Sequence, residues 1–143
     1  MAIPQVVSAD EWRQARDELL LAEKEATRAQ DALAARRRRL PMVAFGAYTF
    51  TATSGDVTLR DLLGDNDQLM VYQFMDLGQD TLRPGCTHLT KNVTALDVLA
   101  DRGIAWATVS NMPIEQIDRL KAELGWTVPF YSSRGTSFSD DCG

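Results

Sequence analysis

Residues 68–75 read Gln68-Leu69-Met70-Val71-Tyr72-Gln73-Phe74-Met75, a short run in which apolar side chains predominate. A run of this length without Gly or Pro predicts a buried β-strand. A polar loop follows it, and Cys86 then precedes a helical pattern that extends from about Leu89 to Arg102. We therefore expect a strand in the middle of a sheet, then a loop, then a helix with the cysteine at its N-terminus.

The segments on either side of this unit predict the remainder of the sheet. In residues 48–59, apolar and polar side chains alternate on either side of a Ser-Gly-Asp turn, which predicts a β-hairpin. Residues 59–63 predict a short helical turn. Residues 104–110 form a second apolar strand, residues 114–124 an amphipathic helix, and residues 126–132 a short extended piece. Two apolar strands joined by a helix indicate a parallel pair with a right-handed crossover. The predicted class is α/β, a three-layer sandwich.

A long α-helix is predicted before this domain. Ser8 and Glu11 can form a capping box at its start, and Pro41 ends it after an interval without Gly or Pro. At ~1.5 Å per residue, ~30 residues span ~45 Å. Its apolar side chains recur three and four residues apart: Trp12, Ala15, Leu19, Ala22, Ala26, Ala29, Leu33 and Leu40.

Two interpretations of this helix stay open. It either lies on the surface of its own domain or forms a dimerisation arm that makes the protein a homodimer. The basic run at residues 36–39 is interpreted as a solvated helix end that complements the helix dipole. We assign residues 1–41 to the arm and residues 42–143 to the α/β domain.

Composition narrows the possible partners and location. The net charge of the 143-residue chain is −5, and the excess of acidic over basic residues lies after residue 40, so we expect no nucleic-acid partner. No apolar run reaches the ~18–20 residues of a membrane span, and the N-terminus lacks the pattern of a signal peptide. Two cysteines are too few for a secreted disulfide framework. We therefore expect a cytoplasmic protein without a membrane partner.

Several short motifs occur in the order found in a known family. They are Ser8-Ala9-Asp10-Glu11-Trp12, Leu40-Pro41, the strand at residues 69–75, Gly85-Cys86, Val109-Ser110, Gly125-Trp126 and Ser132-Ser133-Arg134-Gly135. In these the chain resembles the bacterial thioredoxin-like family known as domain of unknown function 899, more distantly related to peroxiredoxins. The resemblance implies a thioredoxin-like fold and a redox-related function without a settled substrate.

The chain departs from this family in two ways. Leu89 stands where the family usually has the second cysteine of Gly-Cys-x-x-Cys, so only Cys86 carries over. The chain also stops at Gly143, where relatives continue into further strands. We therefore expect a C-terminally truncated thioredoxin-like sheet, with an edge that is either open or covered by a second subunit.

Cys86 is the candidate reactive residue. A helix N-terminus offers unpaired N–H groups and a positive dipole end, which favour thiolate over thiol. Arg83 is a candidate stabiliser of that thiolate, and His88 could lend positive charge, whereas the loop carboxylates Asp76 and Asp80 oppose it. The alternative is that Cys86 is a small apolar filler.

Other candidate chemistry is weaker. Arg83 occupies the position of the threonine in the Thr-x-x-Cys pattern of peroxiredoxins, and Cys142 is a weak candidate for a resolving cysteine. His88 is the only histidine and has no partner at metal-ligand spacing, so we expect no metal and no cofactor.

These observations leave two hypotheses about function. One is a single-cysteine thiol oxidoreductase or peroxidase-like protein that acts through Cys86 on a protein thiol or a small molecule. The other is a redox-inactive thioredoxin-like binding module that dimerises through its N-terminal helix.

Overall fold

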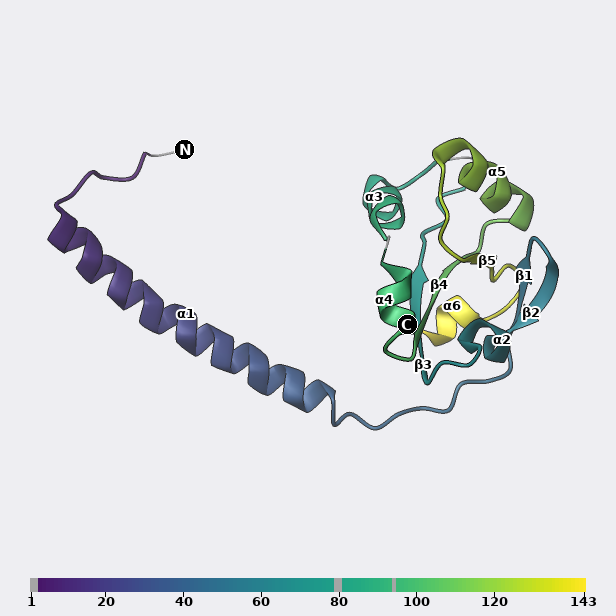
Figure 1. Cartoon of the computed structure of the whole chain (residues 1–143), viewed down its shortest axis with the longest axis horizontal. Coiled ribbons are helices and arrows are strands. Elements are labelled where there is room, and N and C mark those ends of the chain that lie inside the picture. Colours follow the sequence, from purple (N-terminus) through teal and green to yellow (C-terminus); the bar gives the residue numbers. More distant parts are fainter. Residues whose placement is uncertain (1–2, 79–80, 94) are drawn as a thin grey trace. The chain divides into compact units, whose positions relative to one another are not determined.

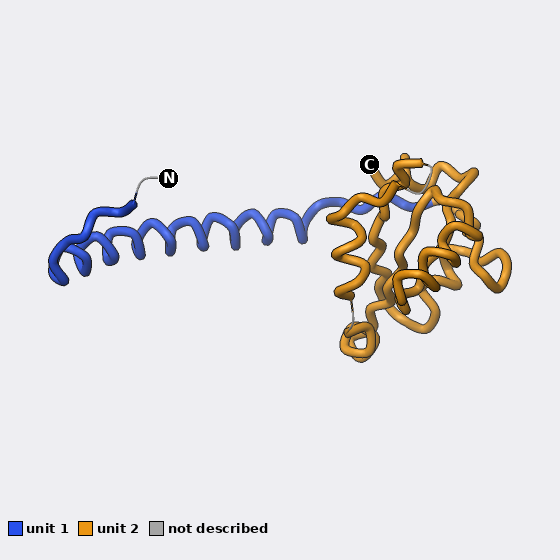
Figure 2. The backbone as a smooth tube through the Cα atoms, turned by 90° about the horizontal axis from the view of Figure 1, so that it is seen from above, with its two compact units in different colours: residues 1–45 blue, residues 46–143 orange. Residues whose placement is uncertain are grey.

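The computed structural model describes residues 3–78, 81–93 and 95–143, and the chain forms two compact units, residues 1–45 and 46–143 (Figure 2). The first unit is dominated by helix α1 (Ala9–Arg37), none of whose residues is buried. The predicted capping box is present: the Ser8 Oγ accepts a hydrogen bond from the Glu11 N–H at 3.3 Å, and the Glu11 carboxylate accepts one from the Ser8 N–H at 2.9 Å. The long N-terminal helix is therefore confirmed.

The second unit contains a five-stranded mixed sheet (Figure 1). Its strands are β1 (Thr49–Ala52), β2 (Gly55–Thr58), β3 (Gln68–Gln73), β4 (Ile104–Ser110) and β5 (Phe130–Ser132), in the order β2-β1-β5-β4-β3. β3 runs parallel to β4 and β4 parallel to β5, whereas the β1–β2 hairpin is antiparallel and β1 is antiparallel to β5. The predicted parallel pair and hairpin are both confirmed.

Helices cover both faces of this sheet. They are α2 (Leu59–Leu63), α3 (Pro84–Asn92), α4 (Leu96–Ala100), α5 (Ile114–Leu124) and α6 (Phe138–Asp141). Neighbouring residues of β5 show the two faces, because Phe130 packs with α3 and α5 in one core cluster while Tyr131 packs with α2 and α6 in another. The protein is thus an α/β sandwich with the sheet as its middle layer.

The position of β3 differs from the expectation. Among the described residues β3 pairs with β4 alone, so it lies at an edge of the sheet and not in its middle. An apolar run indicates that both faces of a strand are covered by other elements. It does not indicate how many neighbouring strands form hydrogen bonds with it. The most buried strand is β4, which has four consecutive buried residues at its end.

One boundary differs from the sequence interpretation. The helix after the loop begins at Pro84, five residues before Leu89, because proline fits the first position of a helix, where no N–H is needed. The C-terminal stretch forms α6 and buries Phe138 against Tyr48 and Phe50, with ring centroids 5.1 and 4.9 Å apart. Within the described residues, no helix combines the length and apolar character needed to cross a membrane.

Candidate functional site

Cys86 lies in the first turn of α3, as the sequence predicts. Arg83 is the N-cap and Pro84 the first helical residue, which makes Cys86 the third. The N–H groups of Gly85 and Cys86 belong to the set that an α-helix leaves without an intrahelical partner. The Cys86 side chain is only 6 % exposed. Its sulfur is therefore held at the positive end of a nine-residue helix, largely shielded from water.

Tyr72 on β3 is the polar neighbour of this sulfur. Its side chain packs against the buried cluster that contains Cys86. Burial, followed by a hydrogen bond to Cys86 and the charge of the cysteine, raises the pKa of Tyr72 to about 12. The phenol therefore keeps its proton at neutral pH and is able to act as a hydrogen-bond donor.

Arg83 belongs to the same group of side chains. Its guanidinium donates a hydrogen bond to the Sδ of Met75, which follows β3. Its positive charge also acts on the phenol of Tyr72 and lowers the pKa of that group, against the larger effect of burial. The structure thus brings Arg83 to the site by way of Tyr72 and Met75.

An apolar cluster surrounds the sulfur on the inner side. Its buried members besides Cys86 are Phe74, Met112, Ile117, Leu120, Trp126 and Phe130. The rings of Phe74, Trp126 and Phe130 are in mutual contact, with centroids 5.5–6.1 Å apart. A hollow of about 410 Å³ next to this cluster is lined by Leu82 and by α5 residues that include Leu120, Arg119 and Glu123. Leu120 and Leu82 thus belong both to the surroundings of this cluster and to the lining of the hollow.

Two buried polar groups near Cys86 have no hydrogen-bond partner among the described residues. They are the Oγ1 of Thr90 and the Nε1 of Trp126, in side chains 2 % and 5 % exposed. Thr90 follows Cys86 by four residues on α3, so the two side chains lie on the same helix face. An unpartnered buried donor costs about 1–3 kcal/mol, a cost that a polar ligand at this place would remove.

His88 does not lie on the face of α3 that carries the sulfur, and Leu89 supplies no second thiol. His88 is exposed, and its Nδ1 lies 3.4 Å from the Nδ2 of Asn92, one turn further along α3. Residues two apart on a helix do not face each other, so His88 and Cys86 lie on different sides of α3. Leu89 is 39 % exposed and puts an apolar side chain where a second thiol would stand. Asp80 lies outside the described residues, and Asp76 accepts a hydrogen bond from the Gly78 N–H at 2.8 Å.

Cys142 is also kept apart from Cys86. It is the C-cap of α6, which packs through Phe138 into the core cluster on the opposite face of the sheet. Both cysteines are free, with Cys142 exposed. Partial burial and the neighbouring Asp141 carboxylate raise the pKa of the Cys142 thiol. The sheet therefore separates the two sulfurs that the sequence had suggested as a pair.

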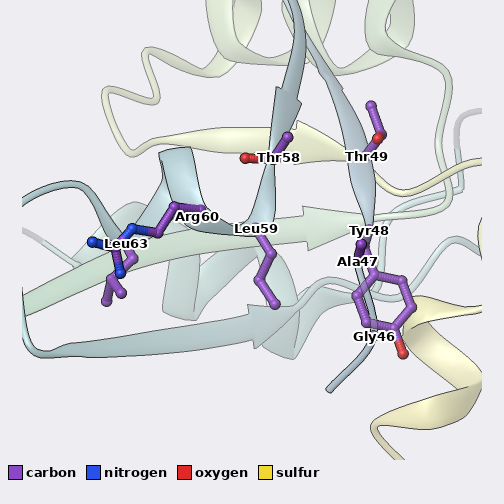
Figure 3. Close-up of a pocket in the computed structure, with 8 residues that line it drawn as sticks. All are labelled: Gly46, Ala47, Tyr48, Thr49, Thr58, Leu59, Arg60 and Leu63. Atoms are coloured by element: carbon purple, nitrogen blue, oxygen red, sulfur yellow. The ribbon is translucent and has the colours of Figure 1, made fainter. Parts of the chain in front are cut away.

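A second hollow is lined by none of the residues that surround Cys86. It has a volume of about 360 Å³ and is formed where the chain enters β1 and passes from β2 into α2 (Figure 3). Arg60 and Tyr48 are its titratable lining residues, and the Tyr48 hydroxyl donates a hydrogen bond to Asp141 at 2.8 Å. Among the residues that the structure describes, no group of three or more His, Cys, Asp or Glu side chains could hold a metal ion. We therefore take the surroundings of Cys86 as the candidate site.

Sequence reasoning missed three members of this site, namely Tyr72, Thr90 and Trp126. A signal was present for Tyr72, because alternation places it on the same strand face as Phe74, and a buried tyrosine hydroxyl needs a partner. Thr90 follows Cys86 at helical spacing. For Trp126 the sequence offers only its apolar context, which predicts packing.

Comparison with known proteins gives one assignment. A search of curated proteins found no match. The family described as "Bacterial protein of unknown function (DUF899)" matches residues 1–143. Since this match covers the whole chain, the protein belongs to that family.

Proposed function

We propose that this protein is a thioredoxin-like, single-cysteine redox protein in which Cys86 reduces a hydroperoxide. The observation that carries the proposal is the burial of Cys86 in the first turn of α3, in the cluster against which Tyr72 packs. A helix N-terminus and a protonated phenol both stabilise negative charge on sulfur, and the thiolate is the nucleophilic form of cysteine. Arg83 adds a positive charge beside the phenol.

The chemistry balances with one external reductant. The Cys86 thiolate attacks the terminal oxygen of the hydroperoxide, an S–O bond forms, and the O–O bond breaks. The departing alkoxide takes up a proton and leaves as an alcohol, and the sulfur becomes a sulfenic acid. A small thiol then condenses with the sulfenic acid to a mixed disulfide and releases water. A second thiol molecule attacks this disulfide and restores Cys86.

Burial supports a small substrate. A protein disulfide must approach a thiolate in line through a wide opening, whereas a sulfur 6 % exposed is reached most readily by a small molecule. The hollow beside Leu120 offers apolar contacts to a small molecule, and the unpartnered Oγ1 of Thr90 offers a polar one. Cys142 lies on the other face of the sheet, so the reducing thiol comes from outside the chain. We place the protein in the cytoplasm, where such thiols are abundant.

The test is hydroperoxide consumption by the full chain with dithiothreitol as reductant. We expect turnover by the wild-type chain and by Cys142→Ser, and loss of turnover in Cys86→Ser. Circular dichroism of each variant shows whether its fold is retained. Equal rates for wild type and a folded Cys86→Ser would overturn the proposal.

A second candidate function rests on α1. None of its residues is buried, and Trp12, Leu19 and Leu33 expose 59 %, 54 % and 44 % of their surface. Exposed large apolar side chains at heptad spacing are typical of a helix that pairs with another helix. We propose a homodimer formed through α1, a role that is compatible with a binding module whether or not Cys86 reacts.

A further inference from the structure

The charge of α1 is divided along its length. Residues 9–25 carry six acidic and three basic side chains, whereas residues 26–39 carry one acidic and five basic ones. The N-terminal half is therefore net negative and the C-terminal half net positive. Two copies of such a helix attract each other when they run antiparallel and repel when they run parallel.

The helix dipole explains only part of this division. Charges that complement the dipole act within the first and last turns, which here hold Asp10, Glu11, Arg36 and Arg37. Acidic residues at positions 17, 18, 23 and 25 lie outside those turns. These central acidic residues lie too far from the helix N-terminus to stabilise a single helix through its dipole.

The apolar seam has a matching pattern of large and small side chains. Its large residues are Trp12, Leu19 and Leu33, and the positions between them are alanines: Ala15, Ala22, Ala26 and Ala29. When two copies run antiparallel with residue 9 opposite residue 39, Leu19 meets Ala29 of the other copy and Leu33 meets Ala15. Large-against-small contacts let the helix axes approach to about 8 Å, the lower end of the usual range.

We propose that two chains pair through α1 in an antiparallel coiled coil in this register. The inference rests on the α1 homodimer proposed above and adds the orientation and the residues in contact. The occupant of the exposed seam is thus a second copy of the chain, selected by charge complementarity along the full length of the helix. The two chains leave the paired helices at opposite ends.

Cysteine cross-linking tests the orientation on the full-length chain. In a cysteine-free background (Cys86→Ala, Cys142→Ser), Ala15→Cys and Leu33→Cys are made in separate chains, mixed and oxidised. We expect a disulfide between the two variants and none within Ala15→Cys alone, because the two residues 15 lie about 27 Å apart along the antiparallel pair. Asp17→Cys mixed with Asp31→Cys is the matched control, since both residues lie at the same level on the outer faces.

Light scattering and salt complete the test. We expect twice the chain mass of 15.9 kDa for the wild type, and a weaker dimer as salt increases, because screening removes the attraction between the two halves. A monomer at all concentrations overturns both the dimer and its orientation. A dimer in which Ala15→Cys cross-links to itself, or in which the 15–33 disulfide does not form, overturns the antiparallel register and leaves the homodimer standing.

Discussion

The two cysteines lie in contrasting regions of the same unit. Cys86 is buried in the first turn of α3, beside a phenol that keeps its proton and near the guanidinium of Arg83. Cys142 is exposed at the end of α6, where partial burial and the Asp141 carboxylate raise the pKa of its thiol. The difference between the two regions is one of surroundings: Cys86 has a helix N-terminus and a phenol nearby, whereas Cys142 has a carboxylate, which disfavours a thiolate.

Helix α6 is held to the domain by packing. We expect the largest change in stability from Phe138→Ala. This substitution removes the ring that contacts Tyr48 and Phe50, with a loss of about 3–5 kcal/mol in the free energy of unfolding. Urea denaturation measures it, with the exposed neighbour Asp140→Ala as control, for which we expect less than about 0.5 kcal/mol. A loss below about 1 kcal/mol for Phe138→Ala would show that α6 contributes little to the core.

Tyr72→Phe removes the hydroxyl that we propose acts on Cys86, and it keeps the ring that stacks on Trp106 at 6.3 Å. Hydrogen bonds to charged groups contribute about 1.5–3 kcal/mol, so we expect oxidation of Cys86 by peroxide to slow by about ten-fold or more. Stopped-flow fluorescence gives the rate. Tyr131→Phe is the matched control, since Tyr131 packs on the opposite face of the sheet. Equal rates in the two variants would remove Tyr72 from the site.

The smallest effect that we expect is a pH dependence of the stability that the hydrogen bonds of α6 contribute. Hydrogen bonds from Ser137 and then Tyr48 lower the pKa of Asp141, so its contribution to stability is present above the ordinary pKa of ~3.9 and is lost as pH falls through the lower folded value. The bond to Asp141 raises the pKa of Tyr48, whose contribution is present below ~10 and is lost as pH rises through the folded value.

Thermal unfolding between these limits checks this dependence. Asp141→Asn keeps the side-chain shape and removes the charge, so we expect its melting temperature to fall less than that of the wild type as pH is lowered toward 3. Parallel curves for the two proteins over that range would contradict the role assigned to Asp141.

Local signals in the sequence were sufficient for much of the fold. The capping box at Ser8, the hairpin before residue 59, the apolar run of β4 and the amphipathic helix α5 each depend on neighbours within a few residues. Such features are dictated by backbone propensity and side-chain period. The placement of Cys86 at a helix start belongs to this group, since Pro84 marks the first helical position.

Features that depend on distant contacts were not predicted. The edge position of β3 depends on which strands pair laterally, and the burial of Phe138 depends on Tyr48 and Phe50, about ninety residues earlier. The contact between Tyr72 and Cys86 likewise requires the loop to bring α3 back onto the strand. Of the candidate site, the positions of Cys86 and Arg83 followed from the sequence, but the neighbouring phenol of Tyr72 did not.

The most direct test of the account is the site of sulfenic acid formation in the full-length protein. The chain is treated with hydrogen peroxide in the presence of a dimedone-type trapping reagent and then digested for peptide mass spectrometry. We predict an adduct on the peptide that contains Cys86 and little or none on the peptide that contains Cys142. An adduct confined to Cys142, or unmodified Cys86 after prolonged exposure to peroxide, would contradict the claim that α3 and Tyr72 activate this sulfur.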